Sequence, residues 1–444
     1  MNKIIPIALM FFLTGSTWAQ ETFSLADAKA YTLTHNLTIK NSENDIKSAE
    51  QRFIEIRGMG LPQVDIIGGF SNFINLPITI VDASFINPNA APGETISFRA
   101  GTKYTASGSI QATQLLFNGS YLIGLQAADY LTMLQENATQ VTKEDAIFNV
   151  IQAYQLAAVA TENLAFADSM VLTTERLIDK QSNYLELGLI KQEEMDQLNY
   201  SLLMSKDARL SAELQLKNAI SLLKFSMGYP MKDNLAITDK ADVLLRESAL
   251  STNTESVTQN LTYTMLEKQV TLSEFDVRNN QFANLPSLST YFTHTYNAYR
   301  NEFNFFAKQP YYAQTVWGLQ LNIPVFSGLS RHARTEQARV RLLNDQNSLK
   351  MMENTLTFQA EQARNNLAGA QSKHELQKEN IALAQSIYDK AITKKEIGEG
   401  NSIIVTQKYN QLIMAQAQYT GALIELFNAR LSLDKIYNNI LPTE

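Results

Sequence analysis

The sequence predicts an α+β membrane protein built from two copies of one unit, a helix, two strands and a long helical hairpin. Three observations predict this fold class: landmarks recur at a nearly constant spacing, four stretches alternate apolar and polar residues, and long helical segments follow each pair of stretches. The strands of one chain are too few to close a membrane sheet. We therefore expect four β-strands per chain that complete a 12-stranded barrel in a trimer.

The duplication is visible in short repeated phrases. Asn-Leu-Thr occurs at 36–38 and again at 260–262, and Leu-Pro occurs at 61–62 and 285–286, so both pairs are 224 residues apart. Farther along, "LLFNG" at 115–119 corresponds to "PVFSG" at 324–328, and Gly188 corresponds to Gly398, at spacings of 209 and 210. The first half therefore carries about 15 extra residues within 74–101, a Pro- and Gly-containing stretch that is expected to be a longer loop.

The landmarks divide the chain into five parts. These are a signal peptide over 1–19, a first repeat over 20–228, a linker over 229–256, a second repeat over 257–438 and a tail over 439–444. The first repeat has expected strands at about 62–74 and 102–116 and a helical hairpin at about 119–228; the second has strands at about 286–299 and 311–324 and a hairpin at about 328–438. A first helix opens each repeat, roughly over 24–57 and 257–281.

The start of the chain and its composition indicate the cellular compartment in which the protein is found. Lys3, an apolar run from Ile4 to Gly15 and small residues near Ala19 are typical of a secretory leader. The 444 residues contain no cysteine, which excludes disulfides and an N-terminal lipid anchor on cysteine and favours a bacterial envelope. Glycosylation of Asn-Leu-Thr is then not expected, and we interpret Asn36 and Asn260 as residues that interrupt the first helix and cap its continuation. A net charge of -7 argues against nucleic-acid binding.

The four alternating stretches are long for soluble strands. "KYTASGSIQAT" at 103–113 and "YYAQTVWGLQLNI" at 311–323 each keep period two for more than ten residues, whereas soluble strands average about 5–6 residues. Aromatic residues crowd between 296 and 312, as at a membrane interface. A soluble two-layer sandwich is the alternative. A dimer would give eight strands, whose side chains fill the interior, and a trimer would leave a water-filled lumen.

The returning helices repeat with a period of seven. Apolar positions are each followed, three residues later, by a mostly small one, which indicates a coiled-coil seam. In the second half the seam is Val405, Leu412, Tyr419, Leu426 and Leu433, with Lys408, Ala415, Ala422, Ala429 and Ile436; in the first half it is Met195, Leu202, Arg209, Leu216 and Leu223, with Leu198, Ser205, Ala212, Ala219 and Ser226. The preceding helices of about 60 residues would span roughly 90 Å. Ordinary bundle packing is the alternative, but a compact domain does not need such rods.

With these features together, the sequence resembles the outer-membrane efflux proteins, the TolC-like family. The opening "SLADAKAYTLTHNLTIKNSENDIKSAEQRFIEIRGMGLPQVDIIGGFS" resembles the family's first helix, its Asn-initiated turn and the Leu-Pro before strand one. The family commonly has Asn-Pro where this chain has Asn36-Leu37 and Asn260-Leu261. The resemblance implies a homotrimer in the bacterial outer membrane, with a 12-stranded barrel in lipid continued by a periplasmic α-helical barrel. It also implies an exit duct for efflux or type I-like secretion, driven by an inner-membrane RND, ABC or MFS pump through a periplasmic adaptor protein.

The resemblance places the functional residues at the hairpin turns. Family members resemble Val-Gly-Leu there, where the adaptor contacts the tube. The matching residues are Leu187, Gly188 and Leu189 in the first half and, less closely, Ile397, Gly398 and Glu399 in the second. Some relatives have an acidic residue six positions after the turn glycine that closes the pore. Glu194, flanked by Glu193 and Asp196, is the candidate gate, although Ile404 departs from this pattern. The alternative is a solvated helix start, where the helix dipole favours acids.

Motifs of enzymes and cofactor sites are absent from the sequence. It has no phosphate-binding glycine loop, zinc-binding His-Glu-x-x-His, calcium loop or nucleophile elbow. The four histidines have no metal-ligand spacing. We therefore expect no catalytic residues, no cofactor and no metal, and a partner that supplies the energy for transport. The alternatives are an exported coiled-coil scaffold or adhesin without a pore and, less compatible with long helices, a passive porin.

Overall fold

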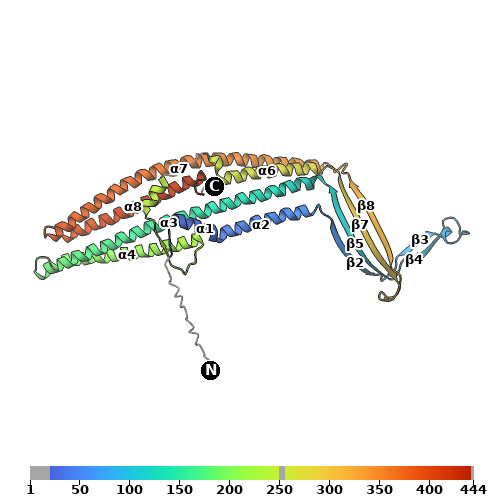
Figure 1. Ribbon diagram of the computed structural model, residues 1–444, viewed down its shortest axis with the longest axis horizontal. Helices are drawn as coiled ribbons and strands as arrows, with labels where there is room; N and C mark the ends of the chain where they lie inside the picture. The colour runs from blue at the N-terminus through green and yellow to red at the C-terminus, as the bar shows by residue number, and fades with distance from the viewer. Residues whose placement is uncertain (1–20, 250–255, 442–444) are drawn as a thin grey trace, which may run out of the picture. The chain divides into compact units, whose positions relative to one another are not determined.

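The computed structural model describes residues 21–249 and 256–441 (Figure 1). The predicted signal peptide and the last residues of the predicted tail lie outside this range. The chain divides into two compact units, and each is described by itself. Of the described residues, the first unit holds 21–44, 137–249, 256–265 and 350–441, and the second holds 45–136 and 266–349. In the described ranges, no helix is both long enough and apolar enough to cross a membrane.

The second unit contains a four-stranded antiparallel sheet. Its strands are β2 (Gln63–Asn72), β5 (Tyr104–Phe117), β7 (Ser287–Arg300) and β8 (Tyr312–Asn322), in the order β2-β5-β7-β8 (Figure 1). Val64 pairs with Ala112 and Ile66 with Ile110, so the apolar positions of neighbouring strands share one face. Among the described residues β2 and β8 each have only one neighbouring strand, which leaves two open edges.

The insertion within 74–101 is not a plain loop, which corrects the expectation from sequence. It forms a second, two-stranded antiparallel sheet of β3 (Ile78–Asp82) and β4 (Thr95–Arg99), joined through the short 3₁₀ helix η1 (Ala83–Phe85). The proline and glycine signals fall in the connection between these strands, where Gly93 has a φ of 87°. The strands themselves are short runs of β-favouring Ile, Val, Thr and Phe, which are easily missed beside so many turn residues.

The two Asn-Leu-Thr sites have the predicted capping role. Asn36 separates α1 (Leu25–His35) from α2 (Leu37–Gly58), and Asn260 separates η2 (Val257–Gln259) from α6 (Leu261–Phe282). Each Asn accepts from the backbone N–H two residues later, at 2.8 Å from Thr38 and 3.0 Å from Thr262. This confirms the interpretation as helix interruption and N-cap.

Each capping Asn also ties its helix to the end of a returning helix. The Asn36 amide donates to the backbone carbonyl of Ser226 at 2.9 Å, and the Asn260 amide donates to that of Ile436 at 3.1 Å. Ser226 and Ile436 are 210 residues apart and therefore equivalent in the duplication. One side chain thus performs two tasks in each half, which explains why the same residue recurs.

Long helical hairpins make up most of the first unit. The first hairpin is α3 (Gly119–Glu186) and α4 (Gln192–Met227), and the second is α7 (Ser330–Glu396) and α8 (Ser402–Ile436). Most small positions of the predicted seam are buried, including Ser205, Ala212, Ala219, Ala415 and Ala422. Arg209 is a charged residue at one of the apolar positions of the same seam. It is exposed, and its Nε donates to the Asp168 carboxylate at 2.6 Å.

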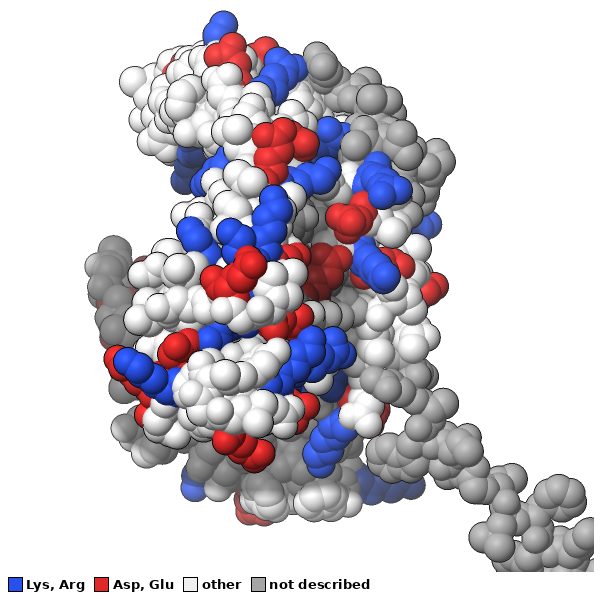
Figure 2. Space-filling view, turned by 90° about the vertical axis from the view of Figure 1, so that its left-hand side faces the viewer, with Lys and Arg blue, Asp and Glu red and all other residues white. Residues whose placement is uncertain are grey.

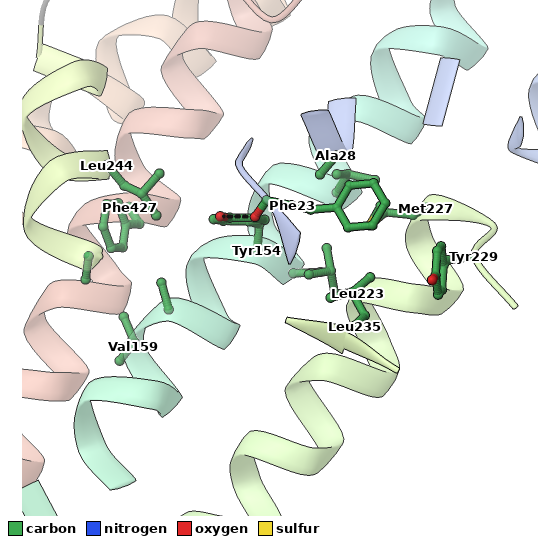
Figure 3. Packing of buried hydrophobic residues seen from close by; sticks show 14 of the residues in the cluster. Phe23, Ala28, Tyr154, Val159, Leu223, Met227, Tyr229, Leu235, Leu244 and Phe427 are labelled. Atoms are coloured by element: carbon green, nitrogen blue, oxygen red, sulfur yellow. Dashed lines mark hydrogen bonds between the residues drawn. The ribbon is translucent and has the colours of Figure 1, made fainter. Parts of the chain in front are cut away.

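The linker between the halves contributes to the core of the first unit. Its strand β6 (Leu235–Ile237) pairs in parallel with β1 (Glu21–Phe23), and α5 (Ala241–Ala249) follows. Figure 3 shows the cluster around these elements, with Tyr154 of α3 donating its hydroxyl to the Phe23 carbonyl at 2.8 Å. The cluster also includes Leu223, Met227, Leu244 and Phe427. This packing holds the middle of α3 against the end of α4 and the later part of α8.

Candidate functional site: the hairpin turns

Both hairpins reverse through the same glycine-dependent turn. Gly188 and Gly398 follow the long helices and have φ angles of 69° and 84°, a left-handed conformation that glycine adopts without strain. The N–H of Leu189 donates to the Tyr184 carbonyl at 2.8 Å, and the N–H of Glu399 donates to the Lys394 carbonyl at 2.9 Å. This is the helix-ending arrangement in which a glycine lets the chain close over the last carbonyls.

Apolar side chains project into solvent at these turns. Leu187 and Leu189 are 71% and 67% exposed, and Ile397 is 62% exposed. Glu399 of the second turn is also exposed. Surface leucines are ordinary singly, but a group of them on a tight turn is typical of a contact surface.

The two turns are joined to each other by a salt bridge. Glu194, in the first turn of α4, accepts from the Lys395 ammonium at the end of α7 and, at 3.3 Å, from the Ser402 hydroxyl at the start of α8. Lys395 is almost fully buried, at 2% exposure, while Glu194 keeps 31%. The hydrogen bond from Lys395 lowers the pKa of Glu194 below its ordinary value, against a smaller opposing effect of burial.

Other contacts strengthen this junction. The Gln181 amide donates to the Lys395 carbonyl at 3.2 Å, and the Lys180 ammonium lies 2.9 Å from the Glu396 carboxylate. Gln181 is itself buried. The end of α3 is therefore fastened to the end of α7 by side chains from both helices.

The candidate gate residues have different surroundings. Glu193 and Asp196 are exposed, and Asp196 accepts from the Gln192 amide at 2.8 Å within the same helix. Glu194 instead points to the second hairpin, so the structure does not bring the three carboxylates into one group. Figure 2 shows acidic and basic side chains interspersed on the face at the hairpin-turn side.

Sequence reasoning missed Lys395, the partner of Glu194. The signal was present, because the spacing of 210 relates Lys395 to Leu185 and Glu194 to Ile404. The second half thus departs from the first at both positions of the salt bridge, which a residue-by-residue comparison of the halves would have revealed. Among the described residues, no group of three or more His, Asp or Glu side chains is placed to hold a metal.

Comparison with known proteins relates the chain to one family of outer-membrane proteins. The family model described as outer membrane efflux protein matches residues 259–439, which comprise most of the second repeat. Outer membrane protein TolC of Salmonella enteritidis is 22% identical over 447 residues, an alignment that covers 98% of this chain and 86% of TolC. The second repeat thus matches the outer-membrane efflux protein family, and the whole chain is similar to TolC.

Solved structures agree with this assignment at the level of the fold. A crystal structure of CusC is similar with a TM-score of 0.71 at 14% identity, covering 98% of both chains. The Campylobacter jejuni CmeC outer membrane channel also gives a TM-score of 0.71 at 14% identity, covering 99% of this chain and 94% of CmeC. The predicted TolC-like fold class is confirmed.

The family match, the TolC relatives and the fold together support an efflux channel of the bacterial outer membrane with a periplasmic helical part. The family and the fold are those of transport channels rather than enzymes. These comparisons give no support to the alternative of an exported scaffold or adhesin without a pore.

Proposed function

We propose that three copies of this chain form one exit duct, which a periplasmic adaptor engages at the hairpin turns and an inner-membrane pump of the RND, ABC or MFS class drives. The observation that carries the proposal is the pair of exposed, glycine-closed turns held side by side by Glu194 and Lys395. Efflux and type I-like secretion both fit such a duct.

The open edges of the sheet support the trimer. β2 and β8 expose backbone groups along ten and eleven residues. Each unpaired backbone group costs several kcal/mol in hydrocarbon, so the edges need strands from other copies. Eight strands leave an interior filled by side chains, whereas twelve leave room for a lumen.

The turns are suited to an adaptor because they combine exposure with rigidity. The first turn presents Leu187, Gly188 and Leu189, and the second presents Ile397, Gly398 and Glu399. A partner that buries the two leucines would gain about 1.5–3 kcal/mol for each. The salt bridge beneath them keeps both turns in one arrangement, which reduces the entropy lost on binding.

Under this proposal, the three candidate gate residues have two different roles. Glu194 holds the two hairpins of one chain together, and the exposed Glu193 and Asp196 supply the carboxylates near the periplasmic opening. In a trimer these would form rings of negative charge that disfavour anions.

Leu189→Glu tests the adaptor proposal. The substitution places a charge where an apolar contact is expected, so docking should weaken at least tenfold, the ratio that corresponds to about 1.4 kcal/mol. Photo-crosslinking to the adaptor in intact cells and an export assay measure the effect. Leu189→Met is the matched control, because it keeps an apolar side chain at the same place.

Trimer assembly should stay intact in both variants, as judged by migration on gels before and after heating. Normal crosslinking and export by Leu189→Glu would contradict a docking role for the turn. A monomer that salt alone releases from membranes would contradict the duct.

A further inference from the structure

The second unit contains a groove where the sheet gives way to helices. It encloses about 420 Å³ between the end of α6 and the start of α7. Gln281 of α6 and Asn284 of the turn after it line one side of the groove. Phe326, Leu329, Arg331 and Arg339 line the other side. The two helices are joined beyond the groove by the Arg341 guanidinium, which donates to Asp276 at 2.6 Å.

One lip of the groove is apolar and open. Val325 and Phe326 are 90% and 85% exposed, and Leu329 is 72% exposed. Val325 continues the odd-numbered apolar series of β8, in which Trp317, Leu319, Leu321 and Ile323 are all exposed. In a membrane channel this series faces lipid, because its neighbours Gln314, Gln320 and Asn322 are polar and face the lumen. The lip therefore lies at the hydrocarbon boundary.

The other lip carries positive charge. Arg331, His332 and Arg339 line the groove, and Glu336 is its one acidic residue. Glu336 is paired with Arg339, whose Nη1 lies 2.5 Å from its carboxylate. Arg331 therefore leaves the groove with an excess of positive charge next to an apolar edge.

In the first half, the positions that correspond to the basic residues of α7 carry no charge, although Arg57 corresponds to Gln281 on the other side of the groove. The spacing of 209 relates Arg331, His332 and Arg339 to Leu122, Ile123 and Tyr130. The junction of sheet and helix thus folds equally well with apolar residues. The repeated fold therefore does not require basic residues at these positions of the second half, which makes the groove a candidate ligand site.

We propose that this groove binds the headgroup of an anionic phospholipid of the outer membrane's periplasmic leaflet. The guanidinium groups of Arg331 and Arg339 contact the phosphate, and the acyl chains lie over Val325 and Phe326. Arginine suits this role because its planar fork donates two hydrogen bonds to a phosphate.

The position of the groove favours lipid over other occupants. It lies between the end of α6 and the start of α7, next to the paired strands β7 and β8 of one chain. A soluble anion would not need the exposed apolar lip. Phospholipid satisfies both the charge and the apolar edge.

Fluorescence quenching tests the proposal on the full-length channel. Trp18 and Trp317, the two tryptophans of the chain, are replaced by Phe, and Phe326→Trp introduces one indole at the groove. The protein is placed in phosphatidylcholine nanodiscs with a small fixed fraction of brominated lipid, either phosphatidylglycerol or phosphatidylcholine. We expect brominated phosphatidylglycerol to quench severalfold more strongly than brominated phosphatidylcholine.

The arginines determine the selectivity in this assay. One arginine near an anionic lipid surface contributes about 1 kcal/mol, a ratio of roughly fivefold. Arg331→Gln with Arg339→Gln should therefore make the two brominated lipids equivalent. Arg334→Gln is the matched control, because Arg334 is exposed on the same helix and does not line the groove. It should keep the selectivity.

Two results would overturn the proposal. Equal quenching by both lipids in the parent protein would show that the groove does not select a headgroup. Quenching by aqueous iodide but by neither lipid would place the groove on the lumen and identify its ligand as a soluble anion. Heat-modifiable migration checks that each variant assembles, so a loss of selectivity is separate from a failure to fold.

Discussion

Glu144 shows how a single buried carboxyl responds to its surroundings. It lies on α3, is 2% exposed, and its Oε1 has no hydrogen-bond partner among the described residues. Burial raises the pKa of Glu144 to about 7, and nearby Lys435 only partly opposes this shift. The folded protein therefore favours the neutral acid at a pH where an unfolded chain, with an ordinary value near 4.5, is ionised.

The raised pKa predicts a pH-dependent effect of Glu144→Gln. Between pH 4.5 and about 7 the Glu144 carboxyl is ionised in the unfolded state but still protonated in the folded state. The free energy of unfolding therefore falls as pH rises through this range. Gln should remove this loss and stabilise the protein at pH 8 by up to about 3 kcal/mol, with little effect at pH 4. Calorimetric melting over this pH range measures it, and Glu136→Gln, an exposed site on α3, is the control. Parallel pH curves for the parent and Glu144→Gln would contradict the assignment.

The salt bridge at the turns leads to a different prediction. Its stabilising contribution is present above pH 4.5 and is lost as pH falls through the lowered folded pKa of Glu194. Glu194→Gln leaves the buried Lys395 ammonium without its carboxylate, so the hairpins should separate and ion leak through bilayers should rise severalfold.

A matched set of variants distinguishes the salt bridge from a charge ring. Lys395→Gln should raise the bilayer leak as much as Glu194→Gln does. Glu193→Gln removes an exposed ring carboxylate but leaves the salt bridge, so it should reduce the preference for cations without raising the leak. If Glu194 instead acts directly on ions, Glu194→Gln alone would change the current, and Lys395→Gln would leave it unchanged.

At the scale of elements, the capping asparagines can be separated into two functions. Asn36→Ala removes both the cap on α2 and the hydrogen bond to the Ser226 carbonyl, and should cost about 1–2 kcal/mol. Asn36→Asp keeps the acceptor for the Thr38 N–H but loses the donor, so it should cost less than Ala. Hydrogen exchange at the first turn of α2 measures the cap. Equal exchange in all three proteins would refute it.

The same elements show what the sequence could reveal. The roles of the asparagines and of the turn glycines could be predicted because both are local. A helix cap and a positive φ each depend on only a few neighbouring residues. The Glu194–Lys395 contact was missed although the two halves differ at both positions, because that difference does not show that residues 201 positions apart meet. The strands β3 and β4 were missed because the intervening Pro and Gly dominate that segment. Which strands pair between copies likewise depends on how several chains are arranged, and the sequence of one chain does not determine that arrangement.

For the whole molecule, the duplication predicts how neighbouring chains meet. In a ring of three two-hairpin chains, each first hairpin contacts the second hairpin of its own chain on one side and that of the next chain on the other. The spacing of 210 relates Glu194 to Ile404 and Lys395 to Leu185. Ile404 is 49% exposed in the single chain. We therefore expect Leu185 to meet Ile404 between chains, as Lys395 meets Glu194 within one.

Paired cysteines test this arrangement, because the chain contains no cysteine of its own. With a short bifunctional thiol reagent, Leu185→Cys with Ile404→Cys should give covalent trimers on denaturing gels. Glu194→Cys with Lys395→Cys should give only chains that migrate as monomers, since that contact is internal. Each single variant is the control and should give no trimer. Monomers alone from the first pair would mean that neighbouring hairpins do not repeat the internal contact, and that the ring lacks the sixfold pseudosymmetry that the duplication implies.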